Sequence, residues 1–282
     1  MYGHRAKKSL GQNFLQNKGI IDKIIDAADP VANDIILEIG PGQGSITKPL
    51  ILLAGKVIAV EKDNDLEAFL RQTYSQEIQE GRFDLINGDI LEFDPEILRF
   101  YGSYKLVANI PYNITGAIIE KFLSASFQPE MMVLMVQKEV ADRIVAKDKK
   151  TGNDGKGSIL SNAIRAYGIP EYICTVKSGS FVPAPKIDSA VIRISDISRK
   201  NFTSKHHEEV FFQVLKAGFA HKRKTLSGNL KNILEPELVE EALRTTGLAL
   251  TVRAEDLGID NWLSVARIVY NAQYESERSP VI

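Results

Sequence analysis

The sequence predicts an α/β protein, in which a doubly wound sheet is followed by a small C-terminal domain made only of helices. Three observations support this. The first two-thirds of the chain alternates β-branched runs with helical patterns, a glycine-rich turn follows the first of these runs, and only helical periodicity remains after Ser198. A length of 282 residues is typical of two domains, which we place at 1–198 and 199–282.

Five runs rich in Ile, Val and Leu end near polar, Gly or Pro residues, as buried parallel strands do. They are Asp34–Ile39, Lys56–Glu61, Phe83–Asn87, Tyr104–Ala108 and Met131–Val136. Helical patterns between them cover Leu66–Ile78 and Gly116–Ser124. Two later runs, Tyr172–Lys177 and Ile187–Ile194, flank Phe181–Pro185 and predict an antiparallel pair. A sheet of this class binds its ligands outside the carboxyl ends of its strands.

The C-terminal region has apolar residues at three- and four-residue spacing, which predicts helices. The predicted helices are His206–Phe219, Arg223–Leu234, Pro236–Thr246 and Ala254–Tyr270. Before this region, Lys147–Gly157 is rich in Lys, Gly and Asp, and it predicts a surface loop.

Charge is distributed unevenly, although the formal net charge is only −1. No acidic residue lies between Glu209 and Glu235, a stretch that contains five basic side chains: Lys216, Lys222, Arg223, Lys224 and Lys231. A second basic group lies near the N-terminus: Arg5, Lys7, Lys8 and Lys18. Such clusters are often only solvated surface, so they do not predict nucleic-acid binding by themselves.

Composition excludes several classes of protein. The hydrophobic and charged fractions, 44% and 25%, are those of a globular chain, and no apolar run approaches the length of a membrane span. A single cysteine, Cys174, excludes an internal disulfide, and its place in a predicted strand favours a buried apolar role. The four histidines have no zinc-binding spacing. We therefore expect a cytoplasmic protein without a metal or a membrane partner.

The sharpest local pattern is Ile36-Leu-Glu-Ile-Gly-Pro-Gly-Gln-Gly44, a strand that runs into a glycine-rich turn. Glycines in such a turn let a ligand approach the backbone, although dinucleotide enzymes and tight strand-to-helix turns also use them. The spacing here is Gly40-x-Gly42-x-Gly44. It differs from the G-x-G-x-x-G pattern that seats a pyrophosphate, and this favours a ligand without one.

Two acidic residues end the next two predicted strands. Glu61 lies about twenty residues beyond the glycine turn, where a carboxylate can accept hydrogen bonds from both hydroxyls of a ribose. A carboxylate at this position would also suit the ribose of NAD. Alternatively, Glu61 could be an ordinary surface glutamate at the start of a helix. Asp89 ends the third strand, where it can accept from an adenine amine or serve as a cap or turn residue.

The fourth strand ends in Asn109-Ile-Pro-Tyr112, which points to one chemistry. The exocyclic amine of adenine is a poor nucleophile because its lone pair is delocalised into the ring. The Asn109 side-chain oxygen and the Ile110 carbonyl can accept its hydrogens and draw the nitrogen toward tetrahedral geometry. Pro111 fixes the backbone that presents this carbonyl, and Tyr112 can stack on a flipped base.

These motifs resemble those of the ribosomal RNA adenine dimethyltransferase family, and most of all its bacterial small-subunit branch. The resemblance rests on five segments in order: Lys8-Ser-Leu-Gly-Gln-Asn-Phe-Leu15, Glu38-Ile-Gly-Pro-Gly-Gln-Gly44, Asn87-Gly-Asp89, Asn109-Ile-Pro-Tyr112 and Phe181-Val-Pro-Ala-Pro-Lys-Ile-Asp-Ser189. Ile110 and Ile187 are conservative departures from its pattern.

The resemblance implies a Rossmann-like S-adenosylmethionine methyltransferase domain and a helical domain that binds RNA or the ribosome. It implies dimethylation at N6 of two adjacent adenosines in a hairpin loop near the 3′ end of 16S rRNA, in the small ribosomal subunit, linked to subunit biogenesis, and we expect a monomer. The implied cofactor-binding residues are Asn13, Leu15, Gly40, Glu61, Asp89 and Asn109. Asn109, Pro111, Tyr112 and Phe181 are the implied catalytic residues, with Tyr112 and Phe181 as the two faces of the base pocket. Without the resemblance, Phe181 reads as a core residue.

Three alternatives stay open at this point. A related enzyme dimethylates one adenosine of large-subunit rRNA and shares the cofactor motifs, but Pro183–Ser189 and His221–Thr225 look more like the small-subunit enzyme. A non-catalytic RNA-binding or ribosome-assembly factor could keep the fold, and the intact Asn109–Tyr112 tetrapeptide argues against it. An NAD-dependent oxidoreductase lacks its fingerprint spacing here.

Overall fold

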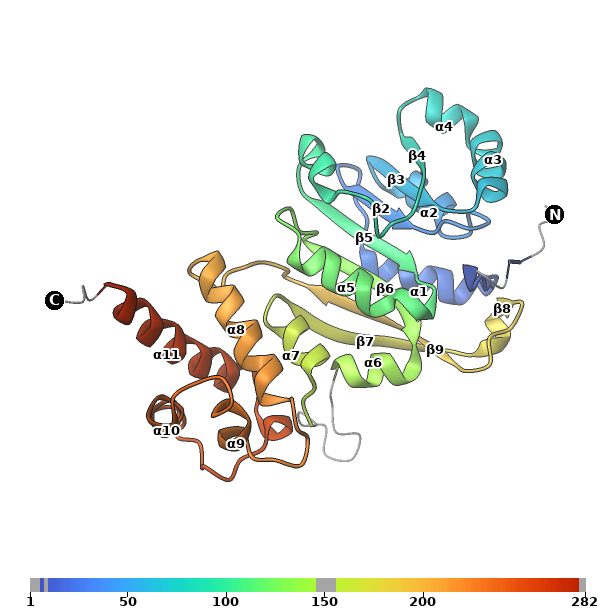
Figure 1. Ribbon diagram of the computed structural model, residues 1–282. Coiled ribbons are helices and arrows are strands. Elements are labelled where there is room, and N and C mark those ends of the chain that lie inside the picture. The colour runs from blue at the N-terminus through green and yellow to red at the C-terminus, as the bar shows by residue number, and fades with distance from the viewer. Residues whose placement is uncertain (1–5, 8–9, 146–155, 279–282) are drawn as a thin grey trace. The chain divides into compact units, whose positions relative to one another are not determined.

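The computed structural model describes residues 6–7, 10–145 and 156–278 (Figure 1). The predicted loop Lys147–Gly157 lies almost entirely outside these residues, as do Arg5 and Lys8 of the N-terminal basic group. The chain forms two compact units: Met1–Asp142 with Gly168–Ile197, and Arg143–Tyr167 with Ser198–Ile282. One boundary between the units falls after Ile197, and the predicted domains meet after Ser198; residues 143–167 group with the helices and not with the sheet.

The first unit is built on a seven-stranded sheet in the order β4-β3-β2-β5-β6-β9-β7. Its strands are β2 (Ile35–Ile39), β3 (Lys56–Glu61), β4 (Phe83–Asn87), β5 (Tyr104–Asn109), β6 (Met131–Gln137), β7 (Ile169–Val176) and β9 (Ser189–Ser195). The first five run parallel, and β9 lies antiparallel between β6 and β7. Both the predicted parallel strands and the predicted late antiparallel pair are therefore confirmed.

Strand order reverses between β2 and β5, which places a ligand crevice at the carboxyl ends of these two strands. Ile36 and Leu37 on β2 and Leu106 on β5 are fully buried. Successive residues of a strand point to opposite faces, so apolar residues occupy both faces of the sheet, as in parallel sheets that helices cover on both sides.

The elements that accompany this sheet are α1 (Lys18–Ala28), α2 (Thr47–Leu53), α3 (Asn64–Thr73), α4 (Ser75–Gln79), η2 (Pro95–Tyr101), η3 (Tyr112–Ile114), α5 (Thr115–Ser124) and α6 (Lys138–Val145). The predicted helix Leu66–Ile78 is wrong as a single element, because α3 and α4 are separated at Tyr74. Tyr74 turns inward there: its ring packs edge-on against Phe83, and its hydroxyl donates to the Gly44 carbonyl at 3.1 Å. Packing under the glycine turn thus ends α3.

A second, two-stranded sheet joins the N-terminal segment to a late part of the same unit. β1 (Phe14–Leu15) pairs antiparallel with β8 (Phe181–Val182). β1 lies against the glycine turn, because Ser45 Oγ donates to the Leu15 carbonyl at 3.0 Å and a Cβ added at Gly42 would lie 3.3 Å from the Phe14 ring. The sequence did not predict this pair, because a two-residue strand has no periodicity to read.

The second unit contains α7 (Ile159–Arg165), α8 (Lys205–Gly218), α9 (Leu226–Leu230), α10 (Pro236–Thr245), η5 (Ala254–Asp256) and α11 (Ile259–Arg278). Its core surrounds the fully buried Trp262, and Ala166 belongs to the same core, which explains why 143–167 groups here. Close packing is visible at Gly218, where an added Cβ would come within 2.4 Å of the Trp262 ring.

Two predicted helices of this unit were too long. Within Arg223–Leu234 only α9 is helical, because Thr225 caps it by accepting from the Gly228 amide at 3.1 Å and a turn precedes it. Ala254–Tyr270 splits into the single turn η5 and the helix α11 around Gly258.

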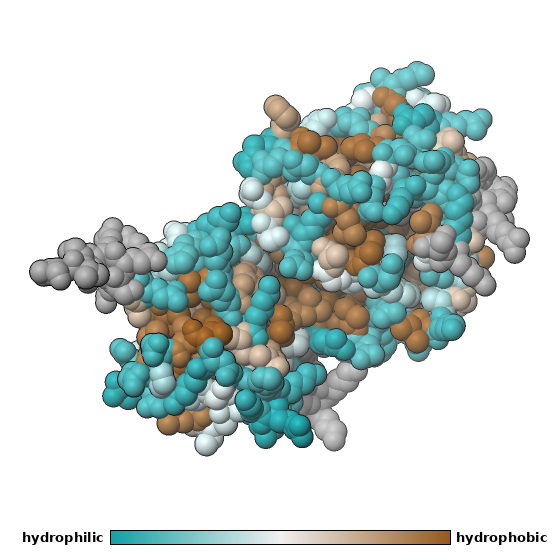
Figure 2. All heavy atoms as spheres, in the orientation of Figure 1, coloured by the Kyte–Doolittle hydropathy of each residue, from teal (hydrophilic) through white to brown (hydrophobic). Residues whose placement is uncertain are grey.

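Hydrophilic residues cover most of the visible face of each unit, and hydrophobic residues appear between them in smaller groups (Figure 2). No helix of the described residues is long and apolar enough to cross a membrane. Within the same residues, no cluster of three or more His, Cys, Asp or Glu side chains could hold a metal ion. Cys174 is half-buried against the core of the first unit, where burial raises the pKa of its thiol.

Candidate functional site

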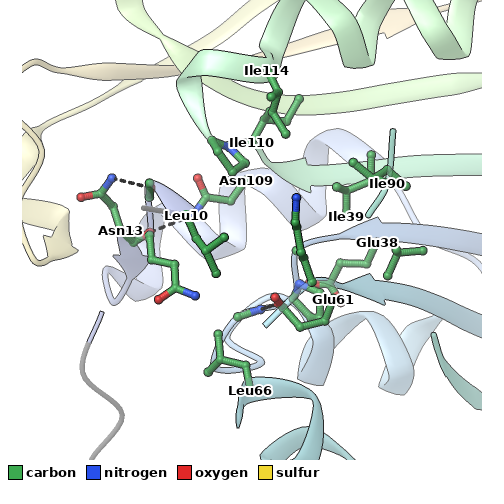
Figure 3. Close-up of a pocket in the computed structure, with 18 of the residues that line it drawn as sticks. Leu10, Asn13, Glu38, Ile39, Glu61, Leu66, Ile90, Asn109, Ile110 and Ile114 are labelled. Atoms are coloured by element: carbon green, nitrogen blue, oxygen red, sulfur yellow. Dashed lines mark hydrogen bonds between the residues drawn. The ribbon is translucent and has the colours of Figure 1, made fainter. Parts of the chain in front are cut away.

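A cavity opens at the carboxyl ends of the central strands of the first unit. Its lining comes from four places: the N-terminal segment Leu10–Leu15, the glycine turn after β2, the ends of β3 and β4, and the segment Asn109–Ile114 after β5. The predicted residues Asn13, Leu15, Gly40, Glu61, Asp89, Asn109, Pro111 and Tyr112 all line it. Figure 3 draws Asn13 beside Asn109, apart from Glu38 and Glu61, which lie close to each other.

The three glycines of the turn differ in what surrounds them. All have positive φ angles, +64° at Gly40, +61° at Gly42 and +79° at Gly44, which L side chains rarely adopt. An added Cβ at Gly44 would lie 2.6 Å from the Tyr74 hydroxyl, so this glycine serves internal packing. At Gly40 no atom lies within 4 Å of an added Cβ. Gly40 therefore faces open cavity, as a ligand that approaches the backbone requires.

Glu61 is held in place by the backbone of its own unit. Its two carboxylate oxygens accept from the Gly42 amide at 3.1 Å and from the Asp63 amide at 2.9 Å. The side chain is only 6% exposed, and burial raises its pKa. A carboxylate oxygen has further lone pairs, so an oriented Glu61 can still accept hydrogen bonds from two neighbouring hydroxyls of a ligand.

Glu38, which precedes the turn, is the most deeply buried acid of the cavity wall. Its side chain is 2% exposed, and its Oε2 has no hydrogen-bond partner among the described residues. Burial raises the pKa of Glu38 to about 8, and the nearby Glu61 carboxylate adds to this. Burial therefore favours the neutral form of Glu38 more than it would in an exposed glutamate.

Asp89 lies where β4 ends, and it is paired with a lysine. Lys62 Nζ lies 2.7 Å from Asp89 Oδ2, while Asp89 Oδ1 accepts from the Leu91 amide at 2.9 Å. These contacts hold the pKa of Asp89 below its usual value, with the Lys62 hydrogen bond as the largest cause. Asp89 is thus an ionised acceptor at the cavity wall. The amide contact also makes it the turn residue that was weighed as an alternative, and the two roles are compatible.

Asn109 is oriented by the N-terminal segment. Its Nδ2 donates to the Asn13 carbonyl at 3.2 Å, which leaves Oδ1 as the acceptor for a ligand. Asn13 in turn donates from its own Nδ2 to the Gly11 carbonyl at 3.1 Å. Two residues predicted separately from distant motifs are therefore joined in one contact, which sets the direction of the Asn109 amide.

Pro111 and Tyr112 lie just after Asn109 in the chain and border the same cavity. Pro111 has φ −56° and ψ 129°, an extended conformation that leads into η3, and Tyr112 begins this turn. Tyr112 is half-buried, and its hydroxyl shares a hydrogen bond of 2.6 Å with Ser189 Oγ at the start of β9. Burial raises the pKa of Tyr112. The phenol is therefore neutral at pH 7, and its ring is fixed at both ends.

Phe181, the other residue predicted for the base pocket, is more deeply buried than Tyr112. The side chain is 2% exposed in β8, belongs to the hydrophobic core of the first unit, and does not line the cavity. It is the core residue that its sequence context alone suggests, and its implied role as the second face of the base pocket stays a prediction. Its backbone is opposite Leu15 in the small sheet, so Phe181 supports the segment that carries Asn13.

Several residues at the site were missed by sequence reasoning. Asp63, the N-cap of α3, binds the N-terminal segment: its Oδ1 lies 2.5 Å from Lys7 Nζ, and its Oδ2 accepts from Gln12 Nε2 at 2.7 Å. Burial alone would raise the pKa of Asp63, but these hydrogen bonds outweigh burial and lower it. The sequence placed Ser189 at the end of the segment Phe181–Ser189 and gave it no role of its own. Asp63 and Ser189 act through contacts with residues far away in the sequence, and no local pattern identifies such contacts.

The basic residues of the second unit divide into two kinds. Lys216, Lys222, Arg223 and Lys224 are exposed, and none forms an ion pair with another described residue. Lys231 instead lies 2.7 Å from Glu240 Oε1, so its charge is already balanced. The three consecutive residues Lys222–Lys224 lie in the turn between α8 and α9, which we call the basic loop. Asn229 shapes this loop by donating to the Gly218 and His221 carbonyls at 2.6 and 3.1 Å.

Comparison with known proteins gives consistent matches. Residues 3–271 match the family described as ribosomal RNA adenine dimethylase. A protein of Dehalococcoides mccartyi (strain CBDB1) called ribosomal RNA small subunit methyltransferase A is 41% identical over 264 residues, 93% of this chain and 87% of that one. One of the same name from Thermosynechococcus vestitus (strain NIES-2133 / IAM M-273 / BP-1) is 38% identical over 274 residues, 95% of this chain and 98% of that one.

Two solved structures resemble the whole fold. The 23S rRNA methyltransferase ErmE has a TM-score of 0.72 at 25% identity and covers 91% of this chain and 99% of its own. A dimethyladenosine transferase from Plasmodium falciparum has a TM-score of 0.72 at 26% identity and covers 93% of this chain and 98% of its own. Both units of the chain are therefore represented in these structures.

Proposed function

The chain belongs to the ribosomal RNA adenine dimethylase family, and we propose that it uses S-adenosylmethionine to dimethylate N6 of two adjacent adenosines. We place these adenosines in a hairpin loop near the 3′ end of 16S rRNA, in the small ribosomal subunit, and link the reaction to subunit biogenesis. On this proposal the protein works as a monomer in the cytoplasm, where ribosomes are assembled.

One observation carries the proposal: a single cavity contains both the glycine turn and the segment Asn109–Tyr112. Asn109 Oδ1 and the Ile110 carbonyl are two acceptors on adjacent residues, and an adenine amine has two hydrogens to donate. Accepting both would draw the amine nitrogen toward tetrahedral geometry and free its lone pair. Each transfer then replaces one of these hydrogens with a methyl group and releases it as a proton to solvent.

The donor set fits S-adenosylmethionine. The open space at Gly40 admits a ligand against the backbone, the fixed carboxylate of Glu61 suits a ribose diol, and the ionised Asp89 suits an adenine amine. Asn13, Leu15 and Asn109 would complete the binding site. When bound, this cofactor supplies a sulfonium methyl group, a strong electrophile that needs no metal. The chain's own part is to hold both reactants in line and to exclude water.

Tyr112 would hold the target base. Its ring borders the cavity next to the two acceptors, and base–aromatic stacking contributes about 1–3 kcal/mol per base. The neutral phenol makes its hydrogen bond to Ser189, so we assign Tyr112 to stacking and not to proton transfer.

The choice between the two ribosomal subunits depends on sequence and not on the fold. ErmE is named as a 23S rRNA methyltransferase, and its structure has the same fold as this chain at 25% sequence identity. The relatives at 41% and 38% identity are named for the small subunit. The basic loop, which would contact phosphates, contains part of the run His221–Thr225 that favours the same choice.

The test combines binding with product mapping. Titration of the purified protein with S-adenosylmethionine and with NAD should give saturable binding of the first only. Incubation with small subunits that lack these methyl groups should then yield two adjacent dimethyladenosines near the 3′ end of 16S rRNA, mapped by primer extension. Methylation of large-subunit rRNA would favour the ErmE-like alternative. Binding of NAD, or RNA binding without methyl transfer, would overturn the proposal.

A further inference from the structure

Ser189 is held in place by the two strands on either side of it. It is fully buried as the first residue of β9, where it pairs with Gln137 of β6 on one side and with Val176 of β7 on the other. The preceding Asp188 is fixed as well, because its carbonyl accepts from the Lys138 amide at 3.1 Å. The hydroxyl of Ser189 therefore has a defined position before any substrate binds.

Tyr112 is the group that this anchor holds. Its backbone follows Pro111 outside the sheet, and its ring extends back until Oη meets Ser189 Oγ at 2.6 Å. A ring held at both the backbone and the phenol oxygen cannot tilt, and stacking depends on the tilt of the ring. Ser189 does not line the cavity, so it would act on a substrate only through Tyr112.

The two methyl transfers make unequal demands on this ring. The unmodified amine has two hydrogens for two acceptors, Asn109 Oδ1 and the Ile110 carbonyl. After the first transfer only one hydrogen remains, so one of these hydrogen bonds cannot form. The monomethylated base is then held by fewer polar contacts, and stacking supplies a larger share of its positioning.

From this geometry we infer that Ser189 is a positioning residue for the second transfer: by fixing the Tyr112 ring it sets the ratio of dimethylated to monomethylated adenosine. The inference rests on the proposed function. It predicts that weakening the contact slows the second transfer more than the first, so that monomethyladenosine accumulates while affinity for the small subunit stays unchanged.

The experiment compares Ser189→Ala, Tyr112→Phe and the double variant with the wild type. Single-turnover time courses on undermethylated small subunits, followed by mass spectrometry of the digested RNA, give the rates of both transfers. In each single variant the second rate should fall relative to the first by about 5–10-fold, the size expected for one hydrogen bond. The double variant should be no worse than the poorer single variant. Ser195→Ala, half-buried at the far end of β9, is the matched control and should match the wild type.

Distinct outcomes overturn distinct claims. A wild-type product ratio in folded Ser189→Ala, or effects that multiply in the double variant, would show that Ser189 does not act through Tyr112. If Ser189→Ala fails to fold, as a thermal melt would reveal, Tyr112→Phe decides alone, because it removes the same hydrogen bond from a half-buried side chain. Absence of methylation by the wild type would refute the proposed function instead.

Discussion

The charged side chains in the cavity of the first unit and in the basic loop of the second unit differ in burial and in hydrogen bonding. In the cavity, Glu38 and Glu61 are buried, and Glu61 and Asp89 each accept from backbone amides or a lysine, so their directions are fixed. In the loop, Lys222, Arg223 and Lys224 are exposed and form no close ion pair with a described carboxylate, although Lys222 contributes, after Lys156, to the lowered pKa of Glu255. Fixed, desolvated groups suit chemistry on one atom, whereas free cations suit contact with many phosphates.

This contrast predicts that variants of the cavity and of the loop fail in separable ways. Cavity variants should lose methyl transfer or cofactor affinity while they keep RNA affinity. Loop variants should lose RNA affinity and keep the rate within the bound complex. The expected effects range from loss of turnover at Asn109 to a change in the pH dependence of stability at Glu38.

The largest effect is expected at Asn109. Asn109→Ala removes the side-chain acceptor for the target amine together with the contact to the Asn13 carbonyl, which lies 3.2 Å from Nδ2. We expect kcat to fall by about 10³-fold with both substrates saturating, the upper end of the range for loss of one fixed polar group in an active site. Near-normal turnover in radiolabelled methyl-transfer assays would show that another residue orients the amine.

Removal of the Tyr112 ring should cause the second-largest loss of activity. Tyr112→Ala loses stacking of about 1–3 kcal/mol, which corresponds to one to two orders of magnitude in the rate at fixed subunit concentration. Tyr112→Phe keeps the ring and should lose much less activity. If Tyr112→Phe were inactive while Asn109→Ala turned over, proton transfer by the phenol would have to replace our assignment.

Glu61→Ala should weaken cofactor binding by about 1.5–3 kcal/mol, the range for hydrogen bonds to charged groups. Isothermal titration with S-adenosylmethionine measures this, and RNA affinity should stay unchanged. Glu67→Ala is the matched control, because the Glu67 carboxylate binds Arg71 on α3 and does not line the cavity. Equal loss of affinity in both variants would remove Glu61 from the cofactor site.

The loop should respond to salt. Neutralising Lys222, Arg223 and Lys224 together should reduce the slope of log affinity against log salt by about 2–3, since each phosphate contact contributes about 0.7–0.9. Lys231→Gln is the control: Glu240 already balances that charge, so the slope should hardly change. A slope unaltered by the triple variant would make the basic loop an ordinary solvated surface.

The last prediction concerns the pH dependence of stability. Burial raises the pKa of Glu38 from 4.5 to about 8, so the folded protein holds a proton that the unfolded chain releases. Stability from this group is fully present below pH 4.5 and is lost as the pH rises toward 8, at about 1.4 kcal/mol per pH unit at most. Urea unfolding of Glu38→Gln should therefore show a flatter decline over this window than the wild type. A parallel decline would mean that Glu38 is ionised in the folded state.

Much of the fold and the site could be predicted because it depends on local patterns. The strands Lys56–Glu61 and Phe83–Asn87 have the predicted bounds, since buried parallel strands are continuous apolar runs. Glu61, Asp89 and Asn109 meet in one cavity because the carboxyl ends of parallel strands share one edge of the sheet.

What could not be predicted depends on contacts between distant parts of the chain. The pairing of Phe14 with Val182 and the hydrogen bond from Tyr112 to Ser189 join residues that no periodicity connects. The break at Tyr74 comes from its packing under Gly44, which overrides a continuous helical pattern. Phe181 shows the converse: its core position could be predicted from its sequence context, whereas its role in the base pocket rests on resemblance alone and stays a prediction.

The most direct test of the separation between cavity and loop is the single-turnover rate of methyl transfer inside the complex with saturating small subunits. We would measure it for the triple variant of Lys222, Arg223 and Lys224 beside Asn109→Ala. We predict a wild-type rate for the loop variant and a rate about 10³-fold lower for Asn109→Ala, with wild-type subunit affinity in the latter. A slow loop variant at saturation, or methyl transfer at a normal rate by Asn109→Ala, would contradict it.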